Sequence, residues 1–342
     1  MSDFTITRTD DPSPYRDHIL SFWNAYLSGT PAGRFDWLRC GNPAGATVWF
    51  IALDGKTREL AGTISLVPRQ LYADGTPVRA GVMGDFMVGE RYRAFGPYLM
   101  LLKEAVGSRA DLGMDYICTL PNRASRKPCE RAGMMKANDL YCFGKPIMVR
   151  FYLRKVAPAV VAGALGSIVS GCLKLVSREL VVAPRDVHEE ALRFDAPFDD
   201  LWSTLRGRAR GLIGDRSARY LSWRYAQNPM YTFRLLVYRE RSASRIGGYL
   251  VFTMFEPNKP EVYDICALND GIAERLIAAL IGVARAEACQ AVYFRAPLSS
   301  SALRIFKRFR FFKTKDALDL YYTGRTDIPF ESYDFLSGDR NI

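Results

Sequence analysis

The sequence predicts an α/β protein with a mixed sheet (α+β in its layout), an arrangement used twice along 342 residues. Strand-like and helix-like segments are interleaved, with hairpins early in each half and a strand–helix–strand unit late. The second half also repeats the first at a constant offset of 186 positions (37 to 223, 62 to 248): Trp37, Asn42, Pro43 and Gly62 recur as Trp223, Asn228, Pro229 and Gly248. Four matches in one register indicate a duplicated domain, although chance recurrence of a turn signal remains an alternative.

In the first half, the expected helix over 15–27 is amphipathic, with Ile19, Phe22, Trp23 and Tyr26 on one face. A short helix over 35–39 stops at a Gly-Asn-Pro turn. Two strands then flank an Asp-Gly turn. The expected strands are 4–7, 47–53, 60–72, 78–88, 115–120 and 137–144, with further helices over 95–108 and 124–133.

The second half follows the same course. Its expected strands are 190–195, 232–239, 245–255, 261–268, 291–296 and 316–323, and its expected helices are 198–208, 217–226, 271–288 and 300–309. We expect each half to close its own sheet with its last strand. The predicted division is a first domain over 1–145, a helical linker over 146–185, a second domain over 186–330 and a tail over 331–342.

Composition narrows the class of protein. The formal charge of +11 suggests an anionic partner such as a nucleotide cofactor, a membrane surface or RNA. Seven dispersed cysteines without a CxxC pair fit reduced thiols in the cytoplasm. Two histidines outside any cluster disfavour a metal site or a histidine triad, and the polar start of the chain does not suggest export.

One apolar run, residues 156–173, is uncharged and has cationic flanks. Its alanines, glycines and serines make it only weakly apolar. Small residues recur every four positions at Ala159, Gly163, Ser167 and Gly171, which favours a helix packed closely between the two domains. Peripheral membrane contact and a true membrane span are the alternatives.

The stretch "VGERYRAFGPYLMLLKEAV", Val88 to Val106, combines a strand end, a turn with two arginines and a glycine, and a helix. Free N–H groups at a helix start attract anions, and Gly96 would let a diphosphate approach the main chain. Arg91 and Arg93 add positive charge, and Pro97 suits the first helical turn. An ordinary capped helix start is the alternative interpretation.

This stretch resembles the cofactor signature of the Gcn5-related N-acetyltransferase (GNAT) superfamily, V-x-P-x-aromatic-R-G-x-G-x-G/A. Ala94 replaces its first glycine, and Tyr98 stands where glycine or alanine is commonest. The resemblance implies two tandem GNAT-like domains and an acyl-CoA, with acetyl-CoA expected and no metal. The cofactor-binding residues that it implies are Met87, Val88 (both through the main chain), Arg91, Arg93, Ala94, Phe95, Gly96, Pro97, Tyr98 and Asn122.

The resemblance also implies catalytic residues. Asp85, eight residues before Arg93, lies where a general base is often found, with a structural hydrogen-bonding role as the alternative. The stretch "CERAGM" matches a helix ending whose tyrosine often protonates the leaving thiolate, but Cys129 stands in that place. Cys129 could act as the acid or simply pack in the core, and Tyr98 is another donor.

The second half lacks the cofactor turn, so its resemblance is to a degenerate domain that supplies acceptor-binding surface. The implied function is N-acylation of an amine, such as an amino sugar or glycan precursor, and the "DRSARYLSWRYAQNP" stretch resembles acyltransferases of bacterial polysaccharide gene clusters. The alternatives are a Fem-type aminoacyl-tRNA-dependent transferase and a non-catalytic acyl-CoA or glycan sensor. We expect a cytoplasmic protein, in contact with the inner face of the membrane if 156–173 touches lipid, without nucleic acid as partner. The oligomeric state is left open.

Overall fold

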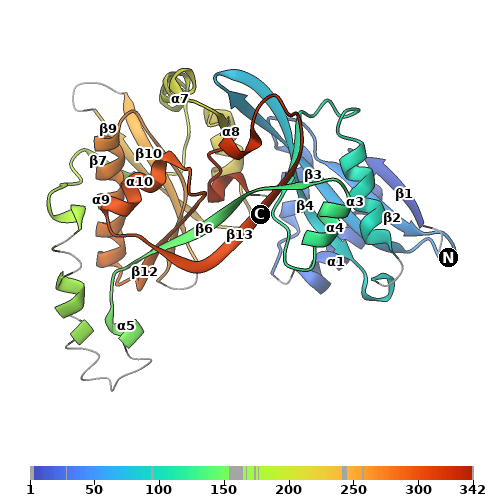
Figure 1. The fold of residues 1–342 in the computed structure, drawn as a ribbon, viewed down its shortest axis with the longest axis horizontal. Coiled ribbons are helices and arrows are strands. Elements are labelled where there is room, and N and C mark those ends of the chain that lie inside the picture. Colours follow the sequence, from blue (N-terminus) through green and yellow to red (C-terminus); the bar gives the residue numbers. More distant parts are fainter. Residues whose placement is uncertain are drawn as a thin grey trace.

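A computed structural model describes residues 4–340, except residues 28, 94–95, 154–164, 167, 173–174, 176, 241–244 and 256–257. Within the described residues a continuous mixed sheet of 13 strands runs the length of the molecule (Figure 1). Its strands are β1 (Phe4–Thr9), β2 (Val48–Asp54), β3 (Leu60–Ala73), β4 (Thr76–Val88), β5 (Tyr116–Thr119), β6 (Met135–Pro146), β7 (Val187–Glu190), β8 (Leu212–Gly214), β9 (Phe233–Arg239), β10 (Ile246–Met254), β11 (Pro260–Ala267), β12 (Ala291–Ala296) and β13 (Phe312–Gly324).

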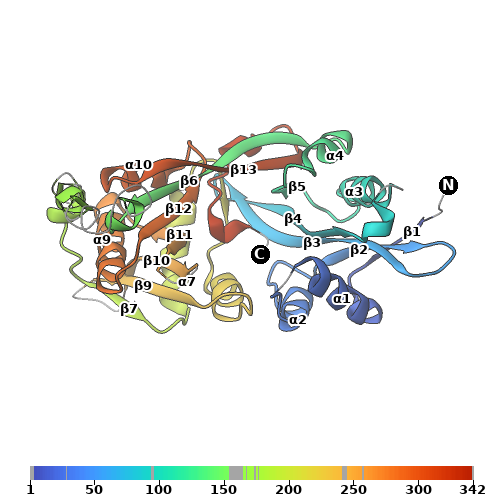
Figure 2. The same cartoon turned by 90° about the horizontal axis from the view of Figure 1, so that it is seen from below.

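Helices cover both faces of this sheet (Figure 2). They are α1 (Arg16–Tyr26), α2 (Gly33–Cys40), α3 (Pro97–Gly107), α4 (Arg126–Arg131), α5 (Arg150–Leu153), α7 (Ala196–Arg208), α8 (Ala218–Leu221), α9 (Asp270–Ala286) and α10 (Ser301–Arg308). Residues of α1, α2, α7 and α8 share one hydrophobic core. A second core lies beneath α3 and α4, and a third beneath α9 and α10.

The two halves exchange their last strands. The sheet order is β1-β2-β3-β4-β5-β13-β6-β12-β11-β10-β9-β7, with β8 added beside β3. Strand β6 ends the first half but pairs with β12, and β13 ends the second half but pairs with β5. The prediction that each half closes its own sheet is therefore wrong. Figure 1 shows green β6 and red β13 running together from one half to the other.

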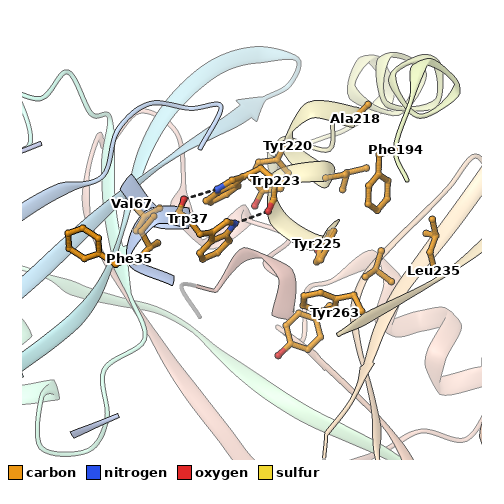
Figure 3. Packing of buried hydrophobic residues seen from close by; sticks show 14 of the residues in the cluster. Phe35, Trp37, Val67, Phe194, Ala218, Tyr220, Trp223, Tyr225, Leu235 and Tyr263 are labelled. Atoms are coloured by element: carbon orange, nitrogen blue, oxygen red, sulfur yellow. Dashed lines mark hydrogen bonds between the residues drawn. The ribbon is translucent and has the colours of Figure 1, made fainter. Parts of the chain in front are cut away.

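The positions that repeat in sequence also correspond in space. Trp37 and Trp223 stack with ring centroids 4.8 Å apart. Each indole Nε1 donates to the main-chain oxygen of the other tryptophan, over 2.8 Å and 3.2 Å (Figure 3). Gly62 and Gly248 both lie where a Cβ would meet a carbonyl oxygen of the next strand, at 2.8 Å and 2.7 Å. The repeated glycines thus have equivalent surroundings in the two halves, and the repeated tryptophans meet at the contact between them.

Most elements lie where the sequence predicts them, with three differences. The strand expected over 190–195 is instead β7, which ends at Glu190. Strand β8 was not expected: its three residues follow Arg210 and Gly211 and add to β3 of the other half. The helix expected over 217–226 begins as α8 and continues as a π-helical turn, Ser222–Ala226.

Candidate functional site

The candidate site begins where β4 leaves its parallel neighbour. Strand β4 pairs with β5 only from Ala80 to Val82. From there to Val88 it is paired on its other side with β3, and its edge toward β5 has no paired strand among the described residues. A register shift against β3 marks a bulge around Asp85, whose φ of 48° is left-handed. Beyond it, Gly89 donates to the Ala61 oxygen. Because antiparallel residues alternate in direction, the main-chain groups of Val88 point away from β3 and into the opening.

The predicted cofactor turn lies at the end of this opening. Gly96 is the N-cap of α3 with a φ of 91°, and Pro97 is its first residue. Among the described residues, no side chain caps this helix start, so its first N–H groups lack the usual partner. A Cβ placed on Gly96 would meet none of the atoms that the structure describes within 4 Å, apart from its chain neighbours, so the space before it is open there. Ala94 and Phe95 lie outside the described residues.

The two arginines of the turn have nearby carboxylates. Arg91 forms an ion pair with Glu59, and its guanidinium lies 4.6 Å from the centroid of the Tyr92 ring. Arg93 lies 3.6 Å from Glu90 and over the ring of Tyr26. Both arginine side chains are more than half exposed, which leaves them able to reorient toward an anion.

Tyr98 and Cys129 lie on the face covered by α3 and α4. The Tyr98 ring stacks on Phe86 of β4 with ring centroids 3.8 Å apart, and in the part of the chain that the structure describes its buried hydroxyl has no hydrogen-bond partner. Burial raises the pKa of Tyr98 to about 12 and that of the Cys129 thiol to about 11, so both keep their protons at neutral pH. Cys129 is 1% exposed and packs in the core, which agrees with the alternative interpretation of this residue as a core side chain.

Asn122 lies in the turn that precedes α4. Its side-chain oxygen accepts hydrogen bonds of 3.0 Å from both the main-chain N–H and the hydroxyl of Ser125. Its carboxamide is therefore engaged in the local turn. The Asn122 side chain is exposed.

The other two predicted partners of the cofactor, Met87 and Val88, are buried within β4.

Asp85 lies in a buried ion pair that the sequence did not suggest. It pairs with Arg34 at the start of α2, and one carboxylate oxygen accepts from the Ser65 hydroxyl at 2.5 Å. The Arg34 guanidinium also lies over the Trp23 ring at 4.8 Å. Both carboxylate oxygens thus have partners, which favours the structural role over that of a free base.

Comparison with known proteins gives structural matches only. No family model and no curated protein matches the sequence. A GCN5-related N-acetyltransferase from Anabaena variabilis superposes with a TM-score of 0.67 at 11% identity, covering 94% of this chain and 73% of that one. A probable N-acyltransferase from Enterococcus faecalis gives a TM-score of 0.65 at 12% identity, covering 94% and 72%.

The N-myristoyltransferase of Saccharomyces cerevisiae, with myristoyl-CoA bound, is also similar. It superposes with a TM-score of 0.62 at 11% identity, covering 96% of this chain and 84% of that one. These matches extend over both halves and share one fold. The chain has the GNAT fold.

The GNAT fold here has a second opening, between β11 and β12. These strands pair only at Glu261 and Val262, and β11 continues to Ala267. A cavity of about 530 Å³ lies at this opening, in the half that is predicted to lack a cofactor site. The helix start beside it differs from that of α3, because the Asn269 side chain caps α9 by accepting from the Ile272 N–H. Asp270 in its first turn would also repel phosphate.

A metal site has no support in the described residues, where no group of three His, Cys, Asp or Glu side chains lies close enough to hold an ion. In the same part of the chain, no helix is both long and apolar enough to span a membrane.

Proposed function

We propose that the chain is an acyl-CoA-dependent N-acyltransferase whose thioester substrate binds at the β4–β5 opening of the first half. One observation carries the proposal: the opening leads from outward-facing Val88 to an uncapped helix start with open space at Gly96. Extended pantetheine can bond to the free edge of β4, and a diphosphate fits the start of α3. The GNAT-fold relatives named above include one with myristoyl-CoA bound.

The reaction transfers the acyl group from the thioester to an amine, which must lose a proton to attack. The main-chain N–H of Val88 would polarise the thioester carbonyl, whereas the alternation along β4 turns the main-chain groups of Met87 toward Thr63 of β3. Tyr98 and Cys129 are the predicted acids for the departing thiolate. With a pKa of about 12, Tyr98 is a weak acid and would donate mainly a hydrogen bond to the thiolate, whereas Cys129 is buried in the core.

The acceptor is an amine, and acetyl is the expected acyl group. An amino sugar or a glycan precursor remains the expected acceptor class, because the net charge of +11 suits a molecule that also carries phosphate or carboxylate.

Binding without catalysis is the second candidate. The Tyr98 ring is stacked on Phe86 of β4, and Asp85 is engaged by Arg34 and Ser65. A sensor would need the diphosphate-binding turn around Arg93 and Gly96 (the cradle) but neither a catalytic acid nor a catalytic base. Such a protein would bind acetyl-CoA saturably and release no thiol with any amine offered.

Titration of CoA into the protein tests the cradle. We expect Arg93→Glu to weaken CoA binding by about tenfold or more, because it reverses a charge beside the diphosphate. Gly96→Val should do the same, since it puts a branched side chain into the open space and a β-branched residue at positive φ. Lys103→Glu is the control for charge, since Lys103 is exposed on the same helix.

If Arg93→Glu and Gly96→Val bound CoA like the wild type while remaining folded, the cradle assignment would be wrong. Thermal unfolding of each variant separates loss of binding from loss of structure.

A membrane contact near the predicted linker is part of the proposal. Residues 156–164, 167 and 173 of the apolar run lie outside the described residues. The side chains of Ile168 and Leu175 are 62% and 72% exposed, and Leu175 lies in a surface hollow with Arg178 and Lys307. Exposed apolar and cationic side chains together suit the anionic inner face of a membrane better than a buried interdomain helix. A cytoplasmic protein bound peripherally there is the proposed location.

A further inference from the structure

The cavity at the β11–β12 opening has the features of a ligand site. It reaches from Trp202 and Leu205 of α7 on one side of the sheet to Ala302 and Ile305 of α10 on the other. Its volume of about 530 Å³ is within the usual range for small-molecule sites.

Two arginines of this cavity have no ion-pair partner among the described residues. Arg208 is the last residue of α7, and Arg210 follows it in the loop before β8. Both line the cavity and both are exposed. The neighbouring Arg216 differs, because its guanidinium is buried between Asp264 and Asp339 at 2.7 Å and 3.0 Å. Arg208 and Arg210 are therefore available to clamp a phosphate or carboxylate.

Two carboxylates of the same cavity each have an unpaired oxygen. Asp264 is fully buried: its Oδ2 accepts from Arg216, but its Oδ1 has no hydrogen-bond partner among the described residues. The Oδ1 of Asp334 is likewise buried and unpaired, although its Oδ2 accepts from the Ser301 hydroxyl at 3.1 Å. Buried polar atoms nearly always have a hydrogen-bond partner. These two oxygens call for a donor, such as an amine or hydroxyl of a ligand.

We propose that this cavity binds a small polar molecule that carries an anionic group and an amine, with Arg208 and Arg210 on the anion and Asp264 and Asp334 on the amine. The ligand is not CoA, because the start of α9 is already capped by Asn269 and carries Asp270.

This site is separate from the proposed acyl-CoA site and does not depend on it. Strands β5, β13, β6 and β12 lie between the two openings. At about 4.8 Å per strand, the openings are roughly 20 Å apart, beyond direct reaction with the thioester.

Glucosamine 6-phosphate is a suitable probe, since it combines a phosphate, an ammonium group and hydroxyls. We expect calorimetric titration at low salt to detect its binding to the full chain. Glucosamine, which lacks the anion, and glucose 6-phosphate, which lacks the amine, should each bind more weakly. D-Glucosaminate carries a carboxylate in place of the phosphate, so its relative affinity identifies the preferred anion.

Variants show which residues bind the phosphate of the probe and which bind its amine. Arg208→Ala combined with Arg210→Ala should weaken the binding of glucosamine 6-phosphate by at least about tenfold. Arg219→Ala is the matched control, because Arg219 is exposed on neighbouring α8 but does not line the cavity. Asp334→Asn should remove the preference for glucosamine 6-phosphate over glucose 6-phosphate, which a merely structural role would leave in place.

Three results would overturn the proposal: no binding of any anionic probe at millimolar concentration, an arginine double variant that binds like the Arg219→Ala control, or displacement of the probe by CoA. The last would instead make the cavity a second CoA site. Failure of CoA to bind at Gly96 would leave these titrations unaffected, so the two proposals fail independently.

Discussion

Asp85 and Asp264 occupy corresponding places in the two halves. Val88 pairs with Gly62 and Ala267 with Gly248, and each aspartate lies three residues before that position. Each also forms a buried ion pair with an arginine from the start of a helical segment, Arg34 or Arg216. The pair therefore recurs in the half that lacks the predicted cofactor turn, which indicates a role in holding the helix to the sheet.

Asp85→Asn tests that role. We expect the free energy of unfolding to fall by about 3–5 kcal/mol, because the Arg34 charge would be left buried without its partner. CoA binding by the folded protein should change little. Urea denaturation and CoA titration measure the two effects, and Asp264→Asn is the matched variant. Normal stability with a strongly reduced kcat and an altered pH profile would restore Asp85 as the base.

Cys118 makes stability depend on alkaline pH. Burial in the core raises the pKa of its thiol to about 12, from an unfolded value near 9. The unfolded chain therefore releases this proton between pH 9 and 12 while the folded chain retains it, so stability falls as pH rises through that range. From pH 7 to pH 10 the thiol should account for about 1.4 kcal/mol of lost stability.

Denaturation at the two pH values checks this in the wild type and in Cys118→Ala. The variant should lose about 1.4 kcal/mol less than the wild type over that interval. Cys40→Ala, at an exposed position, should lose as much as the wild type. An equal loss in all three proteins would contradict the assignment.

Several local features could be predicted from sequence because they depend on neighbours in the chain. Pro97 begins α3, as the turn chemistry predicts, directly after Gly96 with its left-handed φ. The partner of Asp85 could not be predicted in this way. Arg34 lies 51 positions away, and nothing in its surroundings marks it as buried. The charged residues that line the β11–β12 cavity come from equally distant segments.

At the scale of elements, the sequence predicts the strands but not all their partners. The sequence pattern predicts strands over 137–144 and 316–323. The first is observed within β6 and the second within β13. Which half each strand joins depends on pairings between residues about 145 to 208 positions apart (291 − 146 = 145; 324 − 116 = 208), and the two halves offer similar edges. A duplicated sequence leaves this choice open, since closing one sheet and exchanging strands satisfy the same pattern.

The Trp37–Trp223 contact joins the helical segments of the two halves. Either Trp→Phe substitution removes one of the two reciprocal hydrogen bonds and reduces the stacked area. We expect each single change to destabilise the protein and the double change to cost less than the sum, with a coupling of about 1 kcal/mol. Denaturation of the four proteins in a double-mutant cycle measures this coupling. Additive effects would show that the two rings act independently.

At the scale of the whole molecule, strand exchange should merge the two halves into one folding unit. Strand β6 pairs with β12 and β13, so the central sheet alternates between strands of the two halves. If one half unfolded, the other would lose a paired strand and expose an edge. The predicted domain boundaries at 145 and 186 would then mark sequence units that do not unfold separately.

Calorimetry tests this directly. We expect a single transition whose van't Hoff and calorimetric enthalpies agree, in contrast to the two transitions typical of separate domains. Leu140 of β6 is 1% exposed beneath the central strands, and Leu140→Ala should cost about 2–5 kcal/mol. That cost should lower the temperature of the whole transition, because β6 belongs to both halves. Met135→Ala, at a 53% exposed position of the same strand, should leave it nearly unchanged. Two resolved transitions, with only one shifted by Leu140→Ala, would show that the halves unfold independently in spite of the exchange.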